Sequence, residues 1–255
     1  YAISLEWWRV ISDAFDAFGA DPAVGCVVME GAGDKAFASG ADISQFKENR
    51  SNAEAAAEYA KISMSGRQKM LSCEKPFIAK IRGFCMGGGL GIALAADIRI
   101  ASDDSQFGVP AARLSIAYDR VNLSNLMALV GPSKTKEILI TAKRYSAAEA
   151  AAIGLINACV PVADLDAAVT DMTDRIAENA PLSMRATKLT VNELLKDNAA
   201  FDTDLVAGLT KACFDSRDYQ EGQDAFMNKR KPAFEGRGSR FTLRLRQPSG
   251  RWCWW

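Results

Sequence analysis

Two short segments of small residues can place backbone N–H groups around one oxygen atom. Ala38–Asp42 precedes a predicted short helix, so the N–H of Ala41 is expected to point outward. Met86–Gly91 holds three consecutive glycines, and their missing Cβ atoms let a ligand approach the backbone at Gly88. Two such donors would stabilise an enolate oxygen, and losing one donor from such a hole costs about 3 to 4 kcal/mol. Each segment alone is also typical of a tight turn, but the pair favours a site.

A proton-transferring group must be found without histidine, which the chain lacks. This absence excludes Ser-His-Asp and Cys-His nucleophile systems and the common zinc sites that use histidine. Asp119 is the candidate base, because it opens a predicted helix expected to point toward the glycine segments. A helix N-cap, paired with Arg120, is an equally good interpretation of Asp119. Tyr118 is a proton donor, a substrate contact or a packed aromatic, and packing is favoured.

Composition limits the class of protein and its partners. The chain has 255 residues, 49% of them apolar, which suffices for one main α/β domain. Lys and Arg together number 31, as do Asp and Glu, so net charge favours neither nucleic acid nor an anionic membrane as a partner. The six cysteines are scattered without a Cys-x-x-Cys pair, and no apolar run approaches the length of a membrane span. We therefore expect a cytoplasmic protein without a membrane span or a nucleic-acid partner.

The elements expected to position these segments alternate between helices and strands. Three regions are predicted: a layered α/β core over residues 1–160, a helical subdomain over 161–237, and a disordered tail over 238–255. The tail carries arginines and tryptophans without a core-like period, and a binding arm is its alternative interpretation. The predicted strands are Cys26–Met29, Phe77–Ile81, Ile98–Ala101 and Ala158–Val160, and the predicted helices include Leu5–Phe18 capped by Ser4, Ala53–Leu71, Leu90–Ala96 and Ala147–Ile153 behind a Ser146–Glu149 capping box.

A dinucleotide site is a competing interpretation of the first glycine turn. Gly31–Ala36 fits the pattern G-x-G-x-x-A after a strand. However, no long helix is predicted to start at Gly33, and no acidic residue ends a second strand about twenty residues later. The pattern therefore does not favour a nucleotide cofactor.

Four ordered stretches resemble the enoyl-CoA hydratase/isomerase family, also called the crotonase family. Gly31–Ile43 resembles its first signature and Lys75–Asp97 its glycine-rich second signature. Ala148–Val160 and Ser216–Arg230 are similar to later landmarks of the family. The resemblance covers roughly residues 2–237, and the agreement of four landmarks in order makes chance an unsatisfactory explanation.

The resemblance implies an α/β fold, a crotonase-like spiral of β-β-α units with a helical C-terminal trimerisation region. The family's first strand is expected to be missing from the core at 1–160. The resemblance also implies an acyl-CoA thioester as substrate, no cofactor beyond its CoA moiety, no metal, and a homotrimer or a homohexamer.

The same resemblance assigns roles to single residues. Ala41 and Gly88 would supply the oxyanion N–H groups, and the backbone at Ser39 and Ala41 would meet the CoA. Phe226 and Lys229 would reach the CoA of a neighbouring subunit. Taken alone, Phe226 is better read as a core aromatic and Lys229 as a solvated charge.

The reaction type depends on the carboxylates. Hydratases of the family use two glutamates, and the matching positions here are Gly91 and Ala111, so ordinary hydratase chemistry is not expected. Asp119 resembles the catalytic aspartate of family dienoyl-CoA isomerases and halobenzoyl-CoA dehalogenases. One carboxylate can remove a proton at one carbon and return it at another, which predicts double-bond isomerisation with Asp119 as the base. The alternatives are a non-catalytic acyl-CoA-binding homologue and, less favoured, a CoA-thioester hydrolase or dehalogenase.

Overall fold

The fold is built from two sheets, and the strands alternate between them over residues 24–108. The computed structural model describes residues 3–40, 53–196, 200–236 and 241–246. In this part of the chain the larger sheet has the order β8-β5-β3-β1-β9 and the smaller one the order β2-β4-β6-β7. Every pair is parallel except β6 with β7. The strands are β1 (Val24–Glu30), β2 (Ala36–Ala38), β3 (Phe77–Ile81), β4 (Phe84–Met86), β5 (Ile98–Ser102), β6 (Gln106–Gly108), β7 (Tyr145–Ser146), β8 (Ala158–Val160) and β9 (Phe241–Arg246).

A β-β-α unit repeats three times. In each unit the first strand (β1, β3 or β5) joins the larger sheet, the second (β2, β4 or β6) joins the smaller sheet, and a helix (α3, α4 or α5) follows. The predicted spiral of β-β-α units is therefore confirmed. The helices are α1 (Leu5–Ala20), α3 (Ala53–Ser72), α4 (Gly88–Ala93), α5 (Arg120–Thr141), α6 (Ala147–Ala152), α7 (Leu165–Ala177), α8 (Pro181–Leu194), α9 (Thr203–Phe214) and α10 (Arg217–Met227), with 3₁₀ turns at Pro110–Leu114 and Val162–Asp164.

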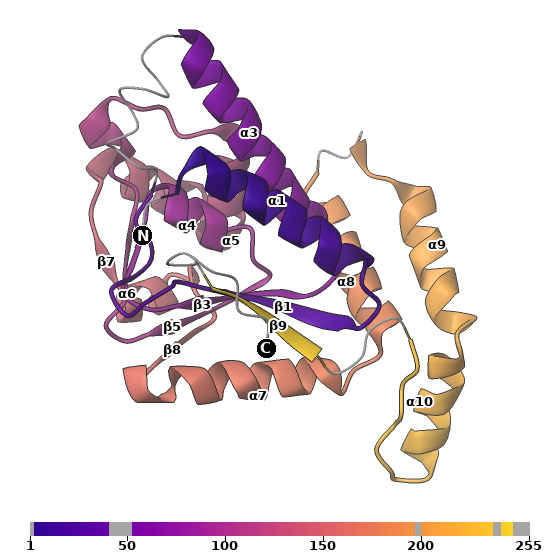
Figure 1. Ribbon diagram of the computed structural model, residues 1–255. Coiled ribbons are helices and arrows are strands. Elements are labelled where there is room, and N and C mark those ends of the chain that lie inside the picture. The colour runs from indigo at the N-terminus through magenta and orange to yellow at the C-terminus, as the bar shows by residue number, and fades with distance from the viewer. Residues whose placement is uncertain (1–2, 41–52, 197–199, 237–240, 247–255) are drawn as a thin grey trace.

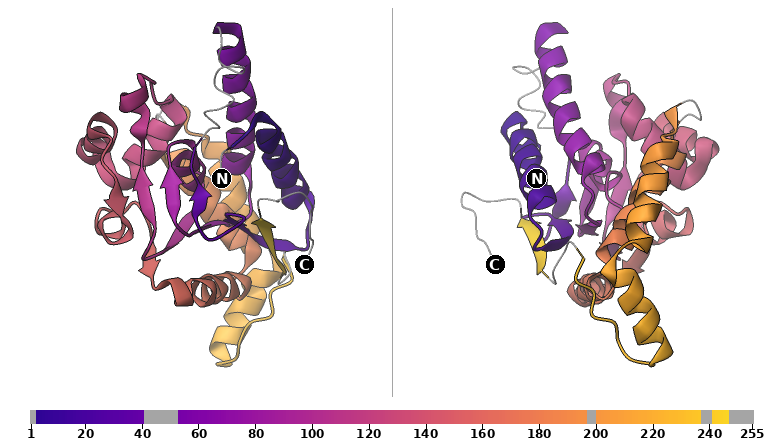
Figure 2. Two further views of the ribbon diagram at one scale, coloured as in Figure 1. Left: turned by 60° about the vertical axis from the view of Figure 1, so that its left-hand side comes forward. Right: turned by 90° about the vertical axis from the view of Figure 1, so that its right-hand side faces the viewer.

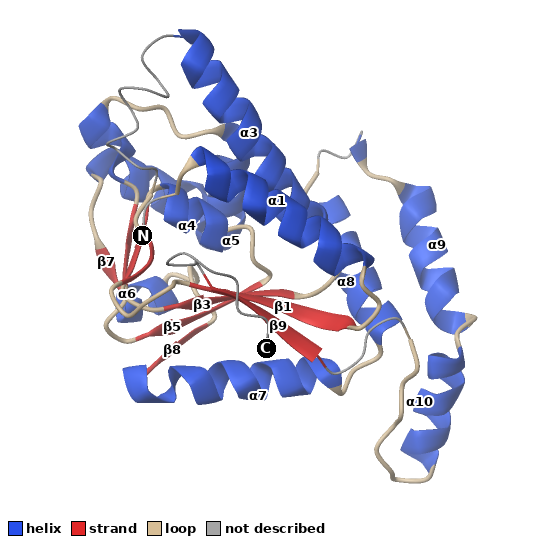
Figure 3. Ribbon diagram, viewed as in Figure 1, coloured by secondary structure: helices blue, strands red, loops and turns tan. Residues whose placement is uncertain are grey.

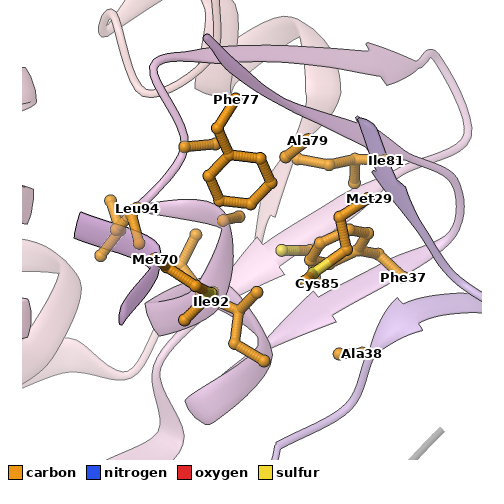
Figure 4. Packing of buried hydrophobic residues seen from close by; sticks show 14 of the residues in the cluster. Met29, Phe37, Ala38, Met70, Phe77, Ala79, Ile81, Cys85, Ile92 and Leu94 are labelled. Atoms are coloured by element: carbon orange, nitrogen blue, oxygen red, sulfur yellow. The ribbon is translucent and has the colours of Figure 1, made fainter. Parts of the chain in front are cut away.

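Helices cover both faces of the larger sheet, as Figures 1 and 3 show. The period-two alternation of β1 sends Val27 and Met29 to one face and Cys26 and Val28 to the other. The first face packs against α1, α3 and α4. Figure 4 shows side chains of this cluster, with Phe77 of β3 near Met70 of α3 and near Ile92 and Leu94 at the end of α4. The second face is covered by α7. The first of these apolar layers also includes Phe37 and Ala38 of β2 and Cys85 of β4, the strands that precede the glycine segments.

Helix α1 shows how the predicted pattern produces the observed packing. Ser4 caps the helix, its side chain accepting a hydrogen bond from the Trp7 N–H, as predicted. Trp8, Ile11, Phe15 and Phe18 recur at helical spacing and are buried against α3 and the sheet.

The C-terminal helices extend beyond the layered body. Helix α8 contacts α9, and α9 contacts α10, which lies away from the sheets in Figures 1 and 2. Helix α7, in contrast, packs directly on β1 and β5. The domain limits at 1–160 and 161–237 stay predictions.

The structure differs from the expectation of disorder within residues 238–255. Phe241–Arg246 form strand β9, which pairs in parallel with β1 in the register Val27↔Leu243 and Met29↔Leu245. The sequence FTLRLR alternates apolar and polar residues, which is the period-two pattern of a strand. The outer edge of β1 is thereby paired, and residues 247–255 lie outside the described part of the chain.

Candidate active site

The two glycine segments lie side by side because their strands are neighbours. Strands β2 and β4 are parallel and therefore end at the same edge of the smaller sheet. A Cβ atom on Gly40 would lie only 3.5 Å from the Gly88 nitrogen and 3.4 Å from the Met86 oxygen. Gly40 and Gly87 have φ angles of 98° and 52°, which favour glycine. The structure thus brings the segments together, whereas Ala41 itself lies outside the described residues.

Gly88 begins α4, where a backbone N–H has no acceptor within the helix. The next residue fixes how closely the helix approaches β2, since a Cβ on Gly89 would lie 2.1 Å from the Ala38 carbonyl oxygen. Ser39, between the strand and Gly40, is exposed. The Gly88 N–H is therefore held at the meeting point of the two segments.

Asp119 is both a helix cap and a member of a polar cluster. Its Oδ1 accepts from the Asn122 backbone N–H at 3.1 Å, which confirms the predicted N-cap of α5. Its Oδ2 accepts from Asn122 Nδ2 at 2.6 Å and from Arg67 Nη1 at 3.0 Å. The side chain of Asp119 remains 34% exposed. Capping therefore does not bury this carboxylate, and its ion-pair partner, Arg67 of α3, was not singled out by the sequence.

Tyr118 connects Asp119 to the second glycine segment. Its hydroxyl donates a hydrogen bond to the Gly87 carbonyl oxygen at 3.3 Å, directly beside Gly88. Burial raises the pKa of the Tyr118 phenol, and the neighbouring charge of Asp119 raises it further. The phenol therefore stays protonated and supports the loop, consistent with the favoured packing role.

The raised pKa predicts a specific alkaline effect on stability. Because the folded state binds the phenolic proton more tightly, the stabilisation is full below the usual tyrosine pKa of 10.0 and is lost as pH rises above it. We expect Tyr118→Phe to unfold with a shallower loss of stability above pH 10 than the wild type, measured by urea unfolding across this range. Identical slopes for the two proteins would contradict the assignment.

The two positions matched to the hydratase glutamates carry no carboxylate. At position 91, the side chain of Asn122 fills the space beside the glycine. Gly91 is buried in α4, and a Cβ added there would lie 2.9 Å from both amide atoms of Asn122. Asn122 is itself buried, and its Oδ1 has no hydrogen-bond partner among the described residues. Ala111 lies in the 3₁₀ turn after β6 and packs against the core. The Asn122 amide thus occupies the space that a side chain at position 91 would need.

Phe226 and Lys229 are not brought to the glycine segments within one chain. Phe226 is 84% exposed at the end of α10, so it is not a core aromatic, and Lys229 is exposed just after that helix. Figures 1 and 2 show α10 well separated from α4. Their contact with the CoA of a neighbouring subunit stays a prediction.

Two hollows lie away from this cluster. One of about 430 Å³ lies between α8 and α10 and includes Phe226, and one of about 750 Å³ lies between α8 and the end of α4. Their described walls include neither Gly88 nor Asp119. Within the described ranges no group of three or more His, Cys, Asp or Glu residues is arranged to hold a metal ion. No described helix has the length and apolar character needed to cross a membrane.

The fold is of the crotonase type. The family model for enoyl-CoA hydratase/isomerase matches residues 1–237. The chain belongs to the enoyl-CoA hydratase/isomerase family.

Relatives within the family carry more than one reaction name. A crotonyl-CoA hydratase of Syntrophomonas wolfei is 36% identical over 233 residues, covering 91% of this chain and 89% of the relative. A peroxisomal Δ(3,5)-Δ(2,4)-dienoyl-CoA isomerase of Arabidopsis thaliana is 31% identical, with 91% and 87% covered. The crystal structure of an enoyl-CoA hydratase/carnithine racemase from Magnetospirillum magneticum superposes with a TM-score of 0.87 at 37% identity, covering 91% of this chain and 86% of the other.

Proposed function

We propose that this protein moves a carbon–carbon double bond in an acyl-CoA thioester, with Asp119 as the base. The observation that carries the proposal is the placement of Asp119. Its carboxylate is partly exposed, and it is tied to the second glycine segment through its neighbour Tyr118, which hydrogen-bonds to Gly87, and through Asn122, which lies against Gly91. Positions 91 and 111 offer no carboxylate. One carboxylate suffices for isomerisation, but the usual hydration mechanism of the family uses two.

The proposed reaction passes through an enolate. Asp119 removes a proton from the saturated carbon next to the thioester carbonyl, or from the saturated carbon that follows a conjugated double bond, and the negative charge moves to the carbonyl oxygen. The N–H groups of Ala41 and Gly88 stabilise that oxygen by donating hydrogen bonds to its developing negative charge. The proton then returns from Asp119 to another carbon of the chain, and the double bond has moved. No group beyond the CoA moiety is needed.

Two other functions have specific support. Relatives named as hydratases argue for addition of water, but neither matched position holds a glutamate here. The absence of both glutamates also supports a non-catalytic acyl-CoA-binding protein, which would need only the backbone of the two glycine segments to bind its ligand. A hydrolase or dehalogenase using Asp119 as a nucleophile ranks lower, because the dehalogenase pattern also needs a histidine and the chain has none.

We also propose a homotrimer or homohexamer in the cytoplasm. Large apolar side chains stay exposed on the C-terminal helices, as expected of a surface covered by another copy. In that assembly Phe226 and Lys229 would reach the CoA bound mainly by a neighbouring subunit, beside the backbone at Ser39. The exposed apolar side chains are Val191, Leu194, Leu195, Phe214, Phe226 and Met227.

Product analysis tests the reaction type. Crotonyl-CoA, a 3-enoyl-CoA and a 3,5-dienoyl-CoA are incubated separately with the protein in D₂O and followed by NMR. We expect double-bond migration in the 3-enoyl or 3,5-dienoyl substrate and little 3-hydroxyacyl-CoA from crotonyl-CoA. Rapid formation of 3-hydroxyacyl-CoA would identify a hydratase instead. Binding without any chemical change would favour the non-catalytic function.

The contact between positions 91 and 122 gives a second prediction. Because a new Cβ would meet the Asn122 amide at 2.9 Å, Gly91→Ala should displace that amide and lower the free energy of unfolding by about 1 kcal/mol. In the Asn122→Ala background the space is vacant, so the same substitution should cost nothing or stabilise α4. Urea unfolding of the four proteins measures the coupling. Equal costs in both backgrounds would show that Asn122 does not fill this space.

A further inference from the structure

Asp119 is held by a small set of donors that we call the clamp, made of Arg67 and Asn122. A carboxylate offers about four lone-pair positions on its two oxygens. Oδ2 receives two donors, Arg67 Nη1 at 3.0 Å and Asn122 Nδ2 at 2.6 Å, whereas Oδ1 receives the Asn122 backbone N–H at 3.1 Å. Within the described part of the chain, the remaining lone-pair position therefore lies on Oδ1.

Arg67 is fixed in its turn by helices α1 and α3. Its side chain is 12% exposed, and its Nη2 donates to Ser63 Oγ at 3.0 Å. Its guanidinium carbon lies 5.3 Å from the centre of the buried Trp8 ring, a cation–π distance. Gly66 lets the helices approach, because a Cβ there would lie 2.8 Å from Trp8. An arginine held on three sides has little rotamer freedom and imposes its geometry on its partner.

We propose that Arg67 is a positioning residue that, together with Asn122, occupies Oδ2 of Asp119 and presents Oδ1 to the substrate as the proton-accepting oxygen. The inference rests on the proposed function, since it specifies which atom of Asp119 takes the proton. It also gives a reason for the glycine at position 91, since Asn122 needs the space that a side chain there would fill. The carboxylate of Asp119 is then oriented by the guanidinium of Arg67 from α3 as well as by α5, the helix that Asp119 caps.

The test separates positioning from folding by substituting each member of the clamp. Arg67→Met keeps an apolar chain against Trp8, and Asn122→Ala removes the amide. We expect each to lower kcat for double-bond migration about 10-fold, and the double variant about 100-fold, with KM within threefold, because a base displaced by about 1 Å loses rate on this scale.

Arg67→Lys should recover part of the loss in kcat. Added guanidinium should accelerate Arg67→Ala but not the wild type, an effect that a merely structural role would not produce. Arg175→Met, on the exposed face of α7, serves as the matched control.

Crystal structures of the Arg67→Met and double variants provide a readout that does not depend on turnover. We expect the Asp119 carboxylate to leave its present orientation in the double variant while the N-terminus of α5 stays helical. If the wild type turns over and the clamp variants keep its kcat, Arg67 does not position the base. If the wild type is inactive, the proposed isomerisation fails, and the crystal structures alone decide whether Arg67 and Asn122 orient Asp119. An unchanged carboxylate in the double variant would overturn the inference in either case.

Discussion

Replacement of Asp119 by asparagine is expected to slow double-bond migration by about 10²- to 10⁴-fold, the range typical of a lost general base. Asparagine also caps helices well, so the N-terminus of α5 should persist. Because the proposed binding site for the acyl-CoA is built from the backbone of the glycine segments and not from Asp119, affinity for the acyl-CoA should change only a few fold. Rates are measured by NMR as deuterium entry and bond migration, and affinity by calorimetry.

A matched variant separates catalysis from a general loss of charge. Asp171→Asn removes an exposed carboxylate on α7 that pairs with Arg175, and such pairs contribute little. It should leave the rate unchanged. If Asp119→Asn were as active as the wild type, Asp119 would serve only as the helix cap, and another group would have to move the proton.

Gly89→Ala is expected to damage both stability and activity. The new methyl group would lie 2.1 Å from the Ala38 carbonyl oxygen, a backbone atom that cannot move without shifting β2. Overpacking of this kind typically costs about 1 to 3 kcal/mol, and occasionally more. The shift would also separate the two segments that meet at Gly40 and Gly88, so acyl-CoA turnover should fall more than stability alone explains. Urea unfolding and a rate measured well below the unfolding midpoint test these two effects.

Gly19→Ala is the control for this substitution. Gly19 lies in helix α1, and nothing lies within 4 Å of the position of its Cβ. Alanine should stabilise the helix there by about 0.5 to 1 kcal/mol. If Gly89→Ala proved as harmless as Gly19→Ala, the close packing of α4 on β2 would be refuted.

The parts of the site that depend on residues close together in the sequence could be predicted. The two glycine runs were visible in the sequence, as were the strands Cys26–Met29 and Phe77–Ile81. The short strands β2 and β4, which place the glycine segments side by side, were not predicted. The cap at Asp119 followed from its place before a helix. The Ser146–Glu149 capping box, with both hydrogen bonds present, was local in the same way.

What the sequence did not reveal depends on long-range contacts. Arg67 lies 52 residues before Asp119, and no spacing rule links a position on α3 to the first residue of α5. The packing of Asn122 against Gly91 likewise arises only after α4 and α5 cross. Strand β9 is different, because its period-two alternation was visible in the sequence but was outweighed by the arginines and tryptophans of the tail.

We propose that backbone N–H groups at Ala41 and Gly88 polarise a thioester carbonyl. Isotope-edited infrared spectroscopy tests this polarisation most directly. The ligand is a 3-enoyl-CoA labelled with ¹³C at that carbonyl, and it is bound to the Asp119→Asn variant so that the substrate is not consumed. We predict that the carbonyl stretch of the bound thioester lies at a clearly lower frequency than that of the free thioester in water. A bound thioester whose carbonyl frequency equals that in water would contradict the oxyanion hole.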